Sequence, residues 1–460
     1  MEQTVSFDLD LIRRYDTAGP RYTSYPTAVE FDDNFTADSY RQQVELSNQR
    51  GGPLSLYFHL PFCDTVCFYC ACNKIITKNR KHAEPYLANL HKEIVMQGEL
   101  FDSNRVVEQL HWGGGTPTFI SHNQMRELMA VTRQNFNLAD DSVGEYSIEV
   151  DPREADAKTI EVLREIGFNR LSLGVQDFNP TVQKAVNRIQ SEAETFAVID
   201  AARANGFRSI SLDLIYGLPH QTPESFAETL DKIIAVDPDR LSVFNYAHMP
   251  ERFKVQRQMK SEDLPLPAVK LEILQQSIEQ LTAAGYIYIG MDHFAKPDDE
   301  LAIAQRENKL YRNFQGYSTH SECDLIGLGV TSIGSVGDSY SQNQRTLEDY
   351  AQSLGNDKLP VFRGITLNED DKIRRTVITR LICHFSLDIS KIEKELDIDF
   401  NDYFIDVLPQ LEQFSQDGLL RYNKQKIEVL PAGHLLIRNI CMAFDRYIQQ
   451  KTQQQFSKVI

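Results

Sequence analysis

The sequence predicts an α/β fold built on a partial, TIM-like (β/α)6 barrel, followed by a mostly helical domain. Between about residues 54 and 249, short apolar runs rich in β-branched and aromatic residues alternate with longer stretches of helical character. Such alternation indicates a parallel sheet with crossover helices. From about residue 367 the pattern changes to helices interrupted by one hairpin, which predicts a winged-helix-like domain at the C-terminal end.

Six strands and the helices between them are predicted in the first part. The strands are expected at 54–60, 108–112, 146–150, 170–175, 209–215 and 240–246, and the helices at 85–100, 124–136, 155–166, 193–205 and 223–236. Ser121 and Thr222 stand where N-caps are expected, and Pro223 suits a first helical turn. Gly167 and Gly206 follow two other helices, where a left-handed C-terminal cap is expected. Six strands instead of eight predict a partial barrel.

The chain is expected to have four segments. Residues 1–50 form an N-terminal extension, 51–290 the core barrel, 291–365 an elaboration, and 366–460 the C-terminal helical domain. In the third segment, residues 325–337 are expected to form a glycine-rich apolar loop. In the fourth, helices are expected at 370–383, 401–413 and 435–450, with a hairpin at 419–430.

Composition and charge exclude several classes of protein. The 460 residues are 42% hydrophobic and 25% charged, as in ordinary globular proteins, and no apolar run is long enough to span a membrane. A net charge of −17 opposes binding of nucleic acid through a broad basic surface. The odd number of cysteines, seven, and a start that is neither basic nor apolar predict a cytoplasmic, reducing location. We expect a monomer, because no coiled-coil pattern or sticky strand edge is evident.

Four of the seven cysteines lie within ten residues, at Cys63, Cys67, Cys70 and Cys72, and the first three are spaced C-x3-C-x2-C. Clusters of the 4Fe–4S type are normally held by four thiolates. Three thiolates leave one iron open to an outside molecule, as catalytic zinc sites leave one position open. The spacing therefore favours a cluster that takes part in chemistry.

A structural zinc site is the alternative for the same cysteines. Zinc ligands usually come as a C-x2-C pair with a second pair well downstream. Here the other three cysteines are isolated in the sequence, at Cys323, Cys383 and Cys441. The spacing thus favours the iron–sulfur interpretation, and a colourless protein would favour zinc.

Polar and glycine residues lie at or just after the end of each predicted strand in turn. These are the cysteine run, Gly113–Thr116, Glu149, Gln176, Asp213 and Tyr246–His248. Because the carboxyl ends of parallel strands meet at one edge, we expect these residues to form a single site. Each taken alone has a plainer interpretation: a tight turn for the glycines, a solvated acid for Glu149, an exposed side chain for Arg188. The histidines at 59, 111, 248 and 293 are expected to be hydrogen-bonded core residues.

The cysteine run, with an aromatic residue just before Cys70, resembles the signature of radical S-adenosylmethionine enzymes. Longer motifs resemble the oxygen-independent coproporphyrinogen III oxidase family. These motifs are Tyr57–Cys63, Cys70–Asn73, His111–Thr118, Gly174–Asp177, Asp213–Pro219 and Asn313–Tyr317. The agreement extends from Arg21–Pro26 to Leu435–Asp445. Related heme-binding or heme-trafficking proteins share the barrel and are the alternative, but they lack a cysteine at the position of Cys72.

The resemblance implies a reaction. Cys63, Cys67 and Cys70 would ligate the 4Fe–4S cluster, and the amine and carboxylate of one S-adenosylmethionine would chelate its open iron. A 5′-deoxyadenosyl radical would then take hydrogen from a propionate of coproporphyrinogen III. Loss of carbon dioxide and one electron would leave a vinyl group, and two such conversions would give protoporphyrinogen IX. An electron donor and an electron acceptor, both unidentified, are implied as partners.

The resemblance also assigns residues. Two S-adenosylmethionine molecules would be bound, the first by Tyr57, Gly114, Glu149 and Ile333, and the second by Tyr69, Gly115, Thr116, Gln176, Arg188, Asp213 and Ala247. Some members have phenylalanine where this chain has Tyr69. Cys72 ligates no iron in the family, and a catalytic role is its hypothesis here. Substrate carboxylates need cationic partners, and Arg21 is the candidate, with Phe314 and Gln315 lining the pocket. The 291–365 elaboration would supply loops for the substrate and the cofactor.

Overall fold

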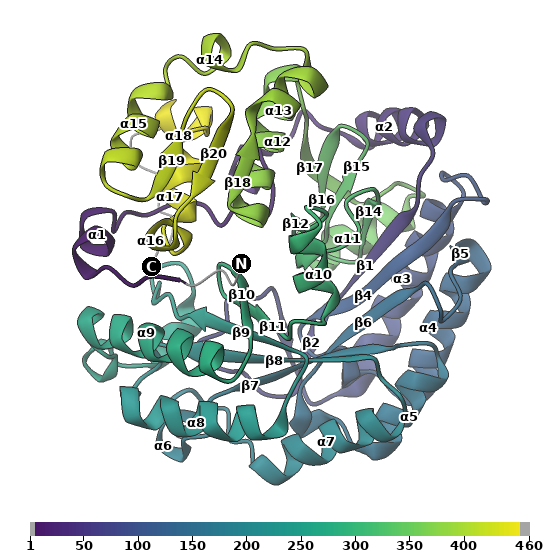
Figure 1. The fold of residues 1–460 in the computed structure, drawn as a ribbon. Helices are drawn as coiled ribbons and strands as arrows, with labels where there is room; N and C mark the ends of the chain where they lie inside the picture. Colours follow the sequence, from purple (N-terminus) through teal and green to yellow (C-terminus); the bar gives the residue numbers. More distant parts are fainter. Residues whose placement is uncertain (1–4, 451–460) are drawn as a thin grey trace. The chain divides into compact units, whose positions relative to one another are not determined.

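The computed structural model describes residues 5–450 (Figure 1). Contacts between residues divide the chain into two units. The sheet unit consists of Glu30–Pro265 and Glu322–Thr366. The composite unit consists of the described parts of Met1–Val29, Leu266–Ser321 and Leu367–Ile460. The four segments predicted from the sequence stay a prediction, because these units are defined by contacts and each draws on distant parts of the chain.

The sheet unit is built on parallel strands, which confirms the predicted fold class. Its six predicted strands are β1 (Leu54–Leu60), β4 (Val106–Gly114), β6 (Glu145–Val150), β7 (Arg170–Gln176), β8 (Ser209–Tyr216) and β9 (Arg240–Asn245). They lie in the order β9-β8-β7-β6-β4-β1, with every neighbouring pair parallel. Within this unit the strand order runs from β9 through β1 to β17 (Val361–Thr366) and does not return to β9, so the barrel is open.

The prediction of a loop at 325–337 is wrong. The chain there forms β14 (Asp324–Leu328) and β15 (Ile333–Val336), and the sheet continues with β16 (Ser339–Asn343) and β17 (Val361–Thr366). Strand β14 pairs in parallel with β1, and the later strands pair antiparallel. A Cβ atom on Gly327 would lie 2.8 Å from the backbone carbon of Ile333. The glycines therefore allow two strands to approach closely. In the sequence, glycines with this role cannot be distinguished from the glycines of a loop.

The predicted crossover helices are confirmed and lie along the outer face of the curved sheet (Figure 1). They are α3 (Ala83–Gly98), α4 (His122–Asn135), α5 (Ala157–Glu165), α7 (Glu192–Ala204) and α8 (Pro223–Val236). Ser121 and Thr222 each form a capping box at the start of a helix. Gly167 and Gly206 have φ angles of 112° and 73°, the left-handed region that glycine adopts at little cost. The unit also contains α2 (Ala37–Arg50), α6 (Pro180–Ala185), α11 (Leu347–Gly355), β2 (Phe62–Cys63), β3 (Ile75–Ile76) and β5 (Asn137–Leu138).

Strands β6, β7 and β8 each present one buried and one half-buried face. The buried face carries residues such as Ile148, Leu173 and Leu212, while the other carries Glu149 and Asp213. On β4, Trp112 is fully buried, and its ring packs edge-on against Phe168 with the centroids 4.8 Å apart. Burial of one such apolar side chain contributes about 2 kcal/mol. This apolar layer fixes the register, so that the polar side chains share the opposite face.

The composite unit is mostly helical, with short hairpins. Its first parts hold α1 (Leu9–Arg14), α9 (Pro267–Ala283), β10 (Ile287–Gly290), β11 (His293–Ala295), α10 (Glu300–Arg306), β12 (Tyr311–Asn313) and β13 (Gly316–Ser318). Its last part holds α12 (Glu369–His384), β18 (Ser386–Asp388), α13 (Ile389–Leu396), α14 (Phe400–Tyr403), α15 (Leu408–Gln416), β19 (Leu420–Tyr422), β20 (Lys426–Val429), α16 (Pro431–His434), α17 (Ile437–Met442) and α18 (Arg446–Gln450). Strands β18, β20 and β19 form a small antiparallel sheet beside the helices.

Two predicted C-terminal helices are broken into shorter ones. The segment predicted at 401–413 divides into α14 and α15, because Pro409 lies in the first turn of α15 and suits a helix start. The segment predicted at 435–450 divides before Arg446. There the Asp445 carboxylate accepts hydrogen bonds from the backbone N–H groups of Tyr447 and Ile448, at 2.9 and 3.3 Å. Asp445 therefore starts a new helix in the middle of the expected one.

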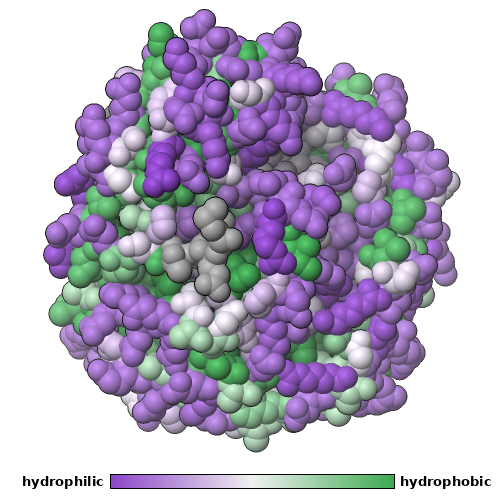
Figure 2. Space-filling model, viewed as in Figure 1, coloured by the Kyte–Doolittle hydropathy of each residue, from purple (hydrophilic) through white to green (hydrophobic). Residues whose placement is uncertain are grey.

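No helix in residues 5–450 is both long and apolar enough to cross a membrane. The face drawn in Figure 2 is mostly hydrophilic, with apolar residues in small separate groups. Scattered apolar residues of this kind are normal on a protein surface and mark no docking site by themselves.

Candidate active site

The cysteine run lies at the carboxyl end of β1 and is anchored to the segment that follows α6. Cys63 ends the short strand β2, and the other three cysteines lie between β2 and β3. The Phe68 N–H donates to the Val186 carbonyl at 3.0 Å, and the Asn187 side chain donates to the Val66 carbonyl at 2.8 Å. These contacts fix the loop on the same edge of the sheet as the ends of β4, β6 and β7.

The glycine run after β4 holds the chain just before Cys63. The Gly115 N–H donates to the Leu60 carbonyl at 2.9 Å, and the Thr116 N–H donates to the Phe62 carbonyl at 2.7 Å. A Cβ atom on Gly115 would lie 2.7 Å from that Phe62 oxygen, closer than real side chains allow. Glycine is required here because two backbones touch, so this run does more than make a tight turn.

The three thiols predicted as ligands share one electrostatic environment. Burial first, and the nearby Cys70 and Cys67, raise the pKa of the Cys63 thiol to about 11. Arg153 Nη2 and Arg188 Nη1 each lie 3.7 Å from Cys67 Sγ and donate to it. Thiolates crowded in this way need positive charge beside them, and iron supplies it. The chemistry of the donor set therefore fits an iron–sulfur cluster, while Cys72 is exposed beside it.

The buried Arg188 and the half-buried Arg153 share one carboxylate at this edge. Asp151 Oδ2 lies 2.7 Å from Arg153 Nη2 and 2.9 Å from Arg188 Nη1. Although burial acts against ionisation, these two guanidinium groups hold the pKa of Asp151 below its usual value. Arg188 also donates to the Gly174 carbonyl at 2.6 Å, and its buried Nε has no partner among the described residues. That nitrogen offers a hydrogen bond to a ligand.

A group predicted to bind the first S-adenosylmethionine surrounds Glu149. The Gly114 N–H donates to Glu149 Oε2 at 3.1 Å, and His111 Nε2 lies 3.5 Å from Oε1. Burial opposes ionisation, but His111 and the Gly114 amide together lower the pKa of Glu149. The Tyr57 ring stacks on His111 with the centroids 5.8 Å apart, and its hydroxyl lies 3.1 Å from His59 Nδ1. The structure thus places an ionised carboxylate where an ammonium group could bind.

Ile333, predicted for the same group, follows a loop that a buried acid holds in place. Glu93 on α3 is fully buried and accepts hydrogen bonds from the Gly329 N–H at 2.7 Å and the Asn343 side chain at 2.6 Å. The Tyr350 hydroxyl donates to the same carboxylate at 2.5 Å. Burial raises the pKa of Glu93 to about 7 despite these donors. No sequence signal identifies this residue, because a glutamate on a helix is usually exposed.

Three of the residues predicted for the second S-adenosylmethionine lie on or just after neighbouring strands: Gln176 ends β7, Asp213 lies on β8 and Ala247 follows β9. The Ser172 hydroxyl donates to Asp213 Oδ2 at 3.0 Å, and burial raises the pKa of Asp213 to about 6. Gln176 ends β7 with a φ angle of 67°. The Gln256 side chain donates to the Tyr69 carbonyl at 3.1 Å and the Ala247 carbonyl at 3.4 Å. It therefore joins the cysteine loop to the end of β9.

The Tyr69 ring packs on an apolar cluster behind the cysteine loop, formed by Val182, Val186, Leu218, Tyr246 and Met259. Thr116 donates from its hydroxyl to Cys63 Sγ at 3.6 Å. All eleven residues predicted to contact S-adenosylmethionine belong to the sheet unit. On the parallel strands, Gly114, Glu149 and Gln176 lie at carboxyl ends, whereas Tyr57 and Asp213 lie near the middle of β1 and β8. Their roles stay predictions.

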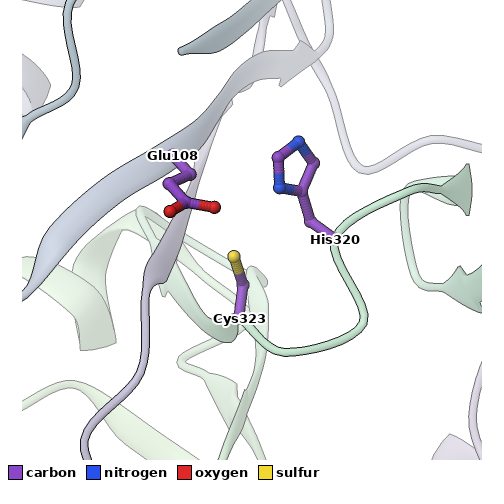
Figure 3. A group of neighbouring side chains, drawn as sticks. All are labelled: Glu108, His320 and Cys323. Carbon is purple, nitrogen blue, oxygen red and sulfur yellow. The ribbon is translucent and has the colours of Figure 1, made fainter. Parts of the chain in front are cut away.

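The isolated Cys323 lies at the other end of the same strands. It precedes β14, and Figure 3 shows its sulfur pointing toward Glu108, near the start of β4. Burial first, and then the Glu108 carboxylate, raise the pKa of the Cys323 thiol to about 12. Since the cysteine run follows the carboxyl end of β1, Cys323 is not part of that group.

His59, His111 and His248, all expected to be core residues, make internal hydrogen bonds. His248 Nδ1 lies 2.8 Å from the Tyr246 hydroxyl. His59 is buried, and its Nε2 lies 3.0 Å from the Asn73 carbonyl. His111 Nδ1 lies 2.6 Å from the Ser147 hydroxyl. Sequence reasoning missed that His111 also faces Glu149, and it missed Arg153 entirely. The only sequence signal for Arg153 is that it follows the strand end of Glu149–Pro152 by one residue.

The three residues predicted to bind substrate lie in the composite unit. Arg21 Nη1 forms an ion pair with Asp292 Oδ2 at 2.7 Å. Phe314 and Gln315 form the turn between β12 and β13. The Arg312 Nε donates to the Arg21 carbonyl at 3.4 Å, so Arg21 lies beside the hairpin that carries the other two.

Comparison with known proteins decides the family. The chain is 56% identical to the oxygen-independent coproporphyrinogen III oxidase of Pseudomonas aeruginosa and 52% identical to that of Escherichia coli K12, over essentially the full length of each pair. The chain belongs to the oxygen-independent coproporphyrinogen III oxidase family. Residues 57–233 match the Radical SAM superfamily model, and residues 367–436 match the HemN C-terminal domain model.

A solved structure agrees with this assignment. It is described as coproporphyrinogen III oxidase (HemN) from Escherichia coli, a radical SAM enzyme, and it is 51% identical in sequence. The two structures match with a TM-score of 0.92, covering 96% of this chain and all of the other. Members of the radical SAM superfamily use a 4Fe–4S cluster and S-adenosylmethionine, and the donor set around Cys63, Cys67 and Cys70 fits both.

Proposed function

We propose that this chain carries out the oxygen-independent oxidative decarboxylation of two propionate groups of coproporphyrinogen III to vinyl groups, giving protoporphyrinogen IX. One observation carries the proposal: three free cysteines on a single anchored loop, at the carboxyl edge of a parallel sheet, in a chain that matches oxidases of this name over its full length. The heme-trafficking alternative gains no support from these relatives.

Within this proposal Cys63, Cys67 and Cys70 hold the cluster. When bound, the cluster supplies the electron that splits S-adenosylmethionine into methionine and a 5′-deoxyadenosyl radical. For each propionate carboxylate, one hydrogen atom leaves with 5′-deoxyadenosine, the carboxylate leaves as carbon dioxide, and one electron leaves to an acceptor. The protein must bind, orient and shield these groups. The cluster needs a donor for the electron that splits S-adenosylmethionine. The electron released from the substrate needs an acceptor, and we propose that donor and acceptor are separate partners.

Glu149 and Asp213 would distinguish two S-adenosylmethionine sites. Glu149 is ionised at neutral pH because its pKa is lowered, so it can accept hydrogen bonds from an ammonium group. The other residues of this proposed site are Tyr57, Gly114 and Ile333. Asp213 would accept from the second molecule. The residues beside it in that site would be Tyr69, Gly115, Thr116, Gln176, Arg188 and Ala247. The unpaired Arg188 Nε supports a ligand there.

Cys72 has a proposed catalytic role apart from the cluster. It is exposed, while Lys74 Nζ lies 3.4 Å from its carbonyl and 2.9 Å from that of Cys70. If Cys72 acts in catalysis, Cys72→Ser should lower vinyl formation at least tenfold and leave iron content unchanged. Equal turnover by variant and wild type, with the cluster intact, would remove the role.

Substrate binding is proposed for Arg21, Phe314 and Gln315. Arg21→Ala should raise the KM for the porphyrinogen more than it slows S-adenosylmethionine cleavage, and equal effects on both would reject the assignment. We further propose a monomer that works in the cytoplasm without nucleic acid. The support is a net charge of −17, an odd cysteine count and the lack of a coiled-coil pattern.

An anaerobic assay tests the proposed function. Reconstituted protein is mixed with coproporphyrinogen III, S-adenosylmethionine and a reductant, and vinyl product, carbon dioxide and 5′-deoxyadenosine are measured together. The proposal expects all three, with carbon dioxide and vinyl groups formed in equal amounts. Stable uptake of heme without vinyl product would instead support the trafficking alternative.

A further inference from the structure

The hairpin β12–β13 carries a buried guanidinium group that lacks an acceptor. Arg312 is 6% exposed, and its Nη1 is buried without a hydrogen-bond partner anywhere in the described chain. Its guanidinium carbon lies 4.8 Å from the centre of the Tyr317 ring, which faces it across the hairpin. An unpaired buried charge is costly, so such a group is normally neutralised by a partner.

Two more arginines make this region positive. Arg438 is buried, and its Nε donates to the Pro20 carbonyl at 2.8 Å, while Arg312 Nε donates to the next carbonyl, that of Arg21. Burial first, and then the Arg21 charge, lower the pKa of Arg438 to about 10, and Arg312 adds to this effect. Arg21 points its own guanidinium at Asp292. We call Arg21, Arg312 and Arg438 the arginine group.

The same hairpin carries a second donor without an acceptor. Gln315 Nε2 is buried, and among residues 5–450 it has no hydrogen-bond partner. The backbone N–H of Gln315 donates to Asn313 Oδ1 at 2.9 Å, which fixes the turn. Guanidinium nitrogens carry only donors, and the amide nitrogen of Gln315 is a donor as well. A ligand for this place must therefore bring acceptors and negative charge.

We propose that Arg312 is the anchor for a carboxylate of the substrate, with Arg21 as the second guanidinium of the site. This inference rests on the proposed function, because coproporphyrinogen III carries four propionate carboxylates. A carboxylate offers two oxygens in the plane that suits a guanidinium fork, and such pairs are among the strongest hydrogen bonds in proteins. Asp292 occupies Arg21 in the structure, and Arg312 Nη1 is free to bind the incoming carboxylate.

A structural role is the competing explanation for Arg312. Its bond to the Arg21 carbonyl and its contact with Tyr317 could simply hold the N-terminal segment in place. The two explanations differ in what the Arg312 charge discriminates. An anchor distinguishes a carboxylate from its neutral ester, whereas a structural arginine affects both ligands equally or neither.

The test is a binding titration with two stable probes, coproporphyrin III and its uncharged tetramethyl ester, in one detergent buffer. Wild type should bind the acid at least tenfold more tightly than the ester. Arg312→Gln should lose about tenfold in affinity for the acid, which corresponds to about 1.4 kcal/mol, and leave ester binding unchanged. Arg312→Lys keeps the charge without the fork and should lie between. Arg421→Gln removes an exposed arginine of the same unit and should match wild type.

Each outcome decides the proposal. It is overturned if Arg312→Gln binds the acid like wild type, or if it loses acid and ester binding equally. If circular dichroism shows that Arg312→Gln does not fold, Arg312→Lys decides. If Arg312→Lys prefers the acid over the ester as strongly as wild type, the proposal that the Arg312 guanidinium anchors the carboxylate is overturned. The proposed function fails separately. If acid binding depends on Arg312 but wild type forms no vinyl product, the anchor stands and the proposed function is rejected. If wild type forms the vinyl product and Arg312→Gln keeps an unchanged KM for the porphyrinogen, the function stands and the anchor is rejected.

Discussion

The cofactor edge of the sheet unit and the arginine group of the composite unit treat buried positive charge differently. At the cofactor edge, Arg153 and Arg188 share the Asp151 carboxylate at 2.7 and 2.9 Å. In the arginine group, Arg312 has no carboxylate partner among the described residues. A buried cation with a partner within the protein helps to hold a site together. A buried cation without one is costly, and we propose that at Arg312 the charge of a ligand offsets this cost.

The largest expected effect concerns the cysteines of the sheet unit, which lie at opposite ends of its strands. Cys67→Ser should abolish cluster assembly and 5′-deoxyadenosine formation, because only two of the proposed ligands remain. Cys323→Ser, at the opposite end of the strands, should keep both. Iron and sulfide analysis after anaerobic reconstitution measures the first, and chromatography of the nucleoside measures the second. Cluster loss in both variants would contradict the assignment of the ligands.

Next in size is the loss of the carboxylate shared by the two arginines. Asp151→Asn leaves the buried guanidinium of Arg188 and the half-buried guanidinium of Arg153 without a counter-charge. We expect about 3 kcal/mol of lost stability in anaerobic urea denaturation. The pKa of Asp151 is lowered in the folded state, so wild type has this stabilisation above about pH 4 and loses it as the pH falls further. The variant should lack that pH dependence.

The exposed pair Arg126–Glu165 provides the control, since the two side chains are 38% and 52% exposed. Glu165→Gln should cost less than about 1 kcal/mol. Similar losses for Asp151→Asn and Glu165→Gln would mean that Arg153 and Arg188 do not depend on Asp151, and the contrast between the two regions would disappear.

A smaller effect is expected from the pH dependence of S-adenosylmethionine binding. Burial raises the pKa of Asp213 to about 6, so this carboxyl becomes protonated as the pH falls below that value. Because a protonated acid accepts hydrogen bonds poorly, wild-type affinity should fall several-fold between pH 7 and 5. Asp213→Asn should bind weakly with no such slope. Equilibrium dialysis of labelled S-adenosylmethionine measures this, and the exposed Asp237→Asn should keep the slope; a slope retained by Asp213→Asn would exclude Asp213 as its source.

The smallest prediction adjusts the arginine group itself. Asp292 pairs with Arg21 at 2.7 Å and therefore competes with any carboxylate that approaches this guanidinium. Asp292→Asn should tighten coproporphyrin III binding about three-fold, the scale of a partly exposed ion pair, and leave the tetramethyl ester unaffected. Weaker binding of the acid by this variant would show that Asp292 positions Arg21 for the ligand.

The six parallel strands and their helices could be predicted because each carries its own pattern. The site at their carboxyl ends followed from topology alone, since a parallel sheet brings successive strand ends together. Strands β14 and β15 could not be predicted, because their glycines serve a close approach that depends on a partner strand. The breaks before α15 and α18 did have local signals, Pro409 and Asp445, which the apolar periodicity outweighed.

Contacts between charged groups that are distant in the sequence could not be predicted either. Nothing near Arg153 indicates that it contacts Cys67, 86 residues away, and nothing near Arg312 indicates that it is buried. Arginine is mostly exposed, so sequence reasoning assigns such residues to the surface. Phe314 and Gln315 were named through resemblance, whereas the unpaired nitrogens of the hairpin became visible only in three dimensions.

The claim on which the account depends is that three cysteines hold a 4Fe–4S cluster whose fourth iron is open to S-adenosylmethionine. Electron paramagnetic resonance of the reduced, reconstituted protein, with and without S-adenosylmethionine, tests it most directly. The account predicts about four irons per chain and a spectrum that changes when S-adenosylmethionine is added. A spectrum that does not change, in a protein that loses its cluster on Cys72→Ser, would show four protein ligands and contradict it.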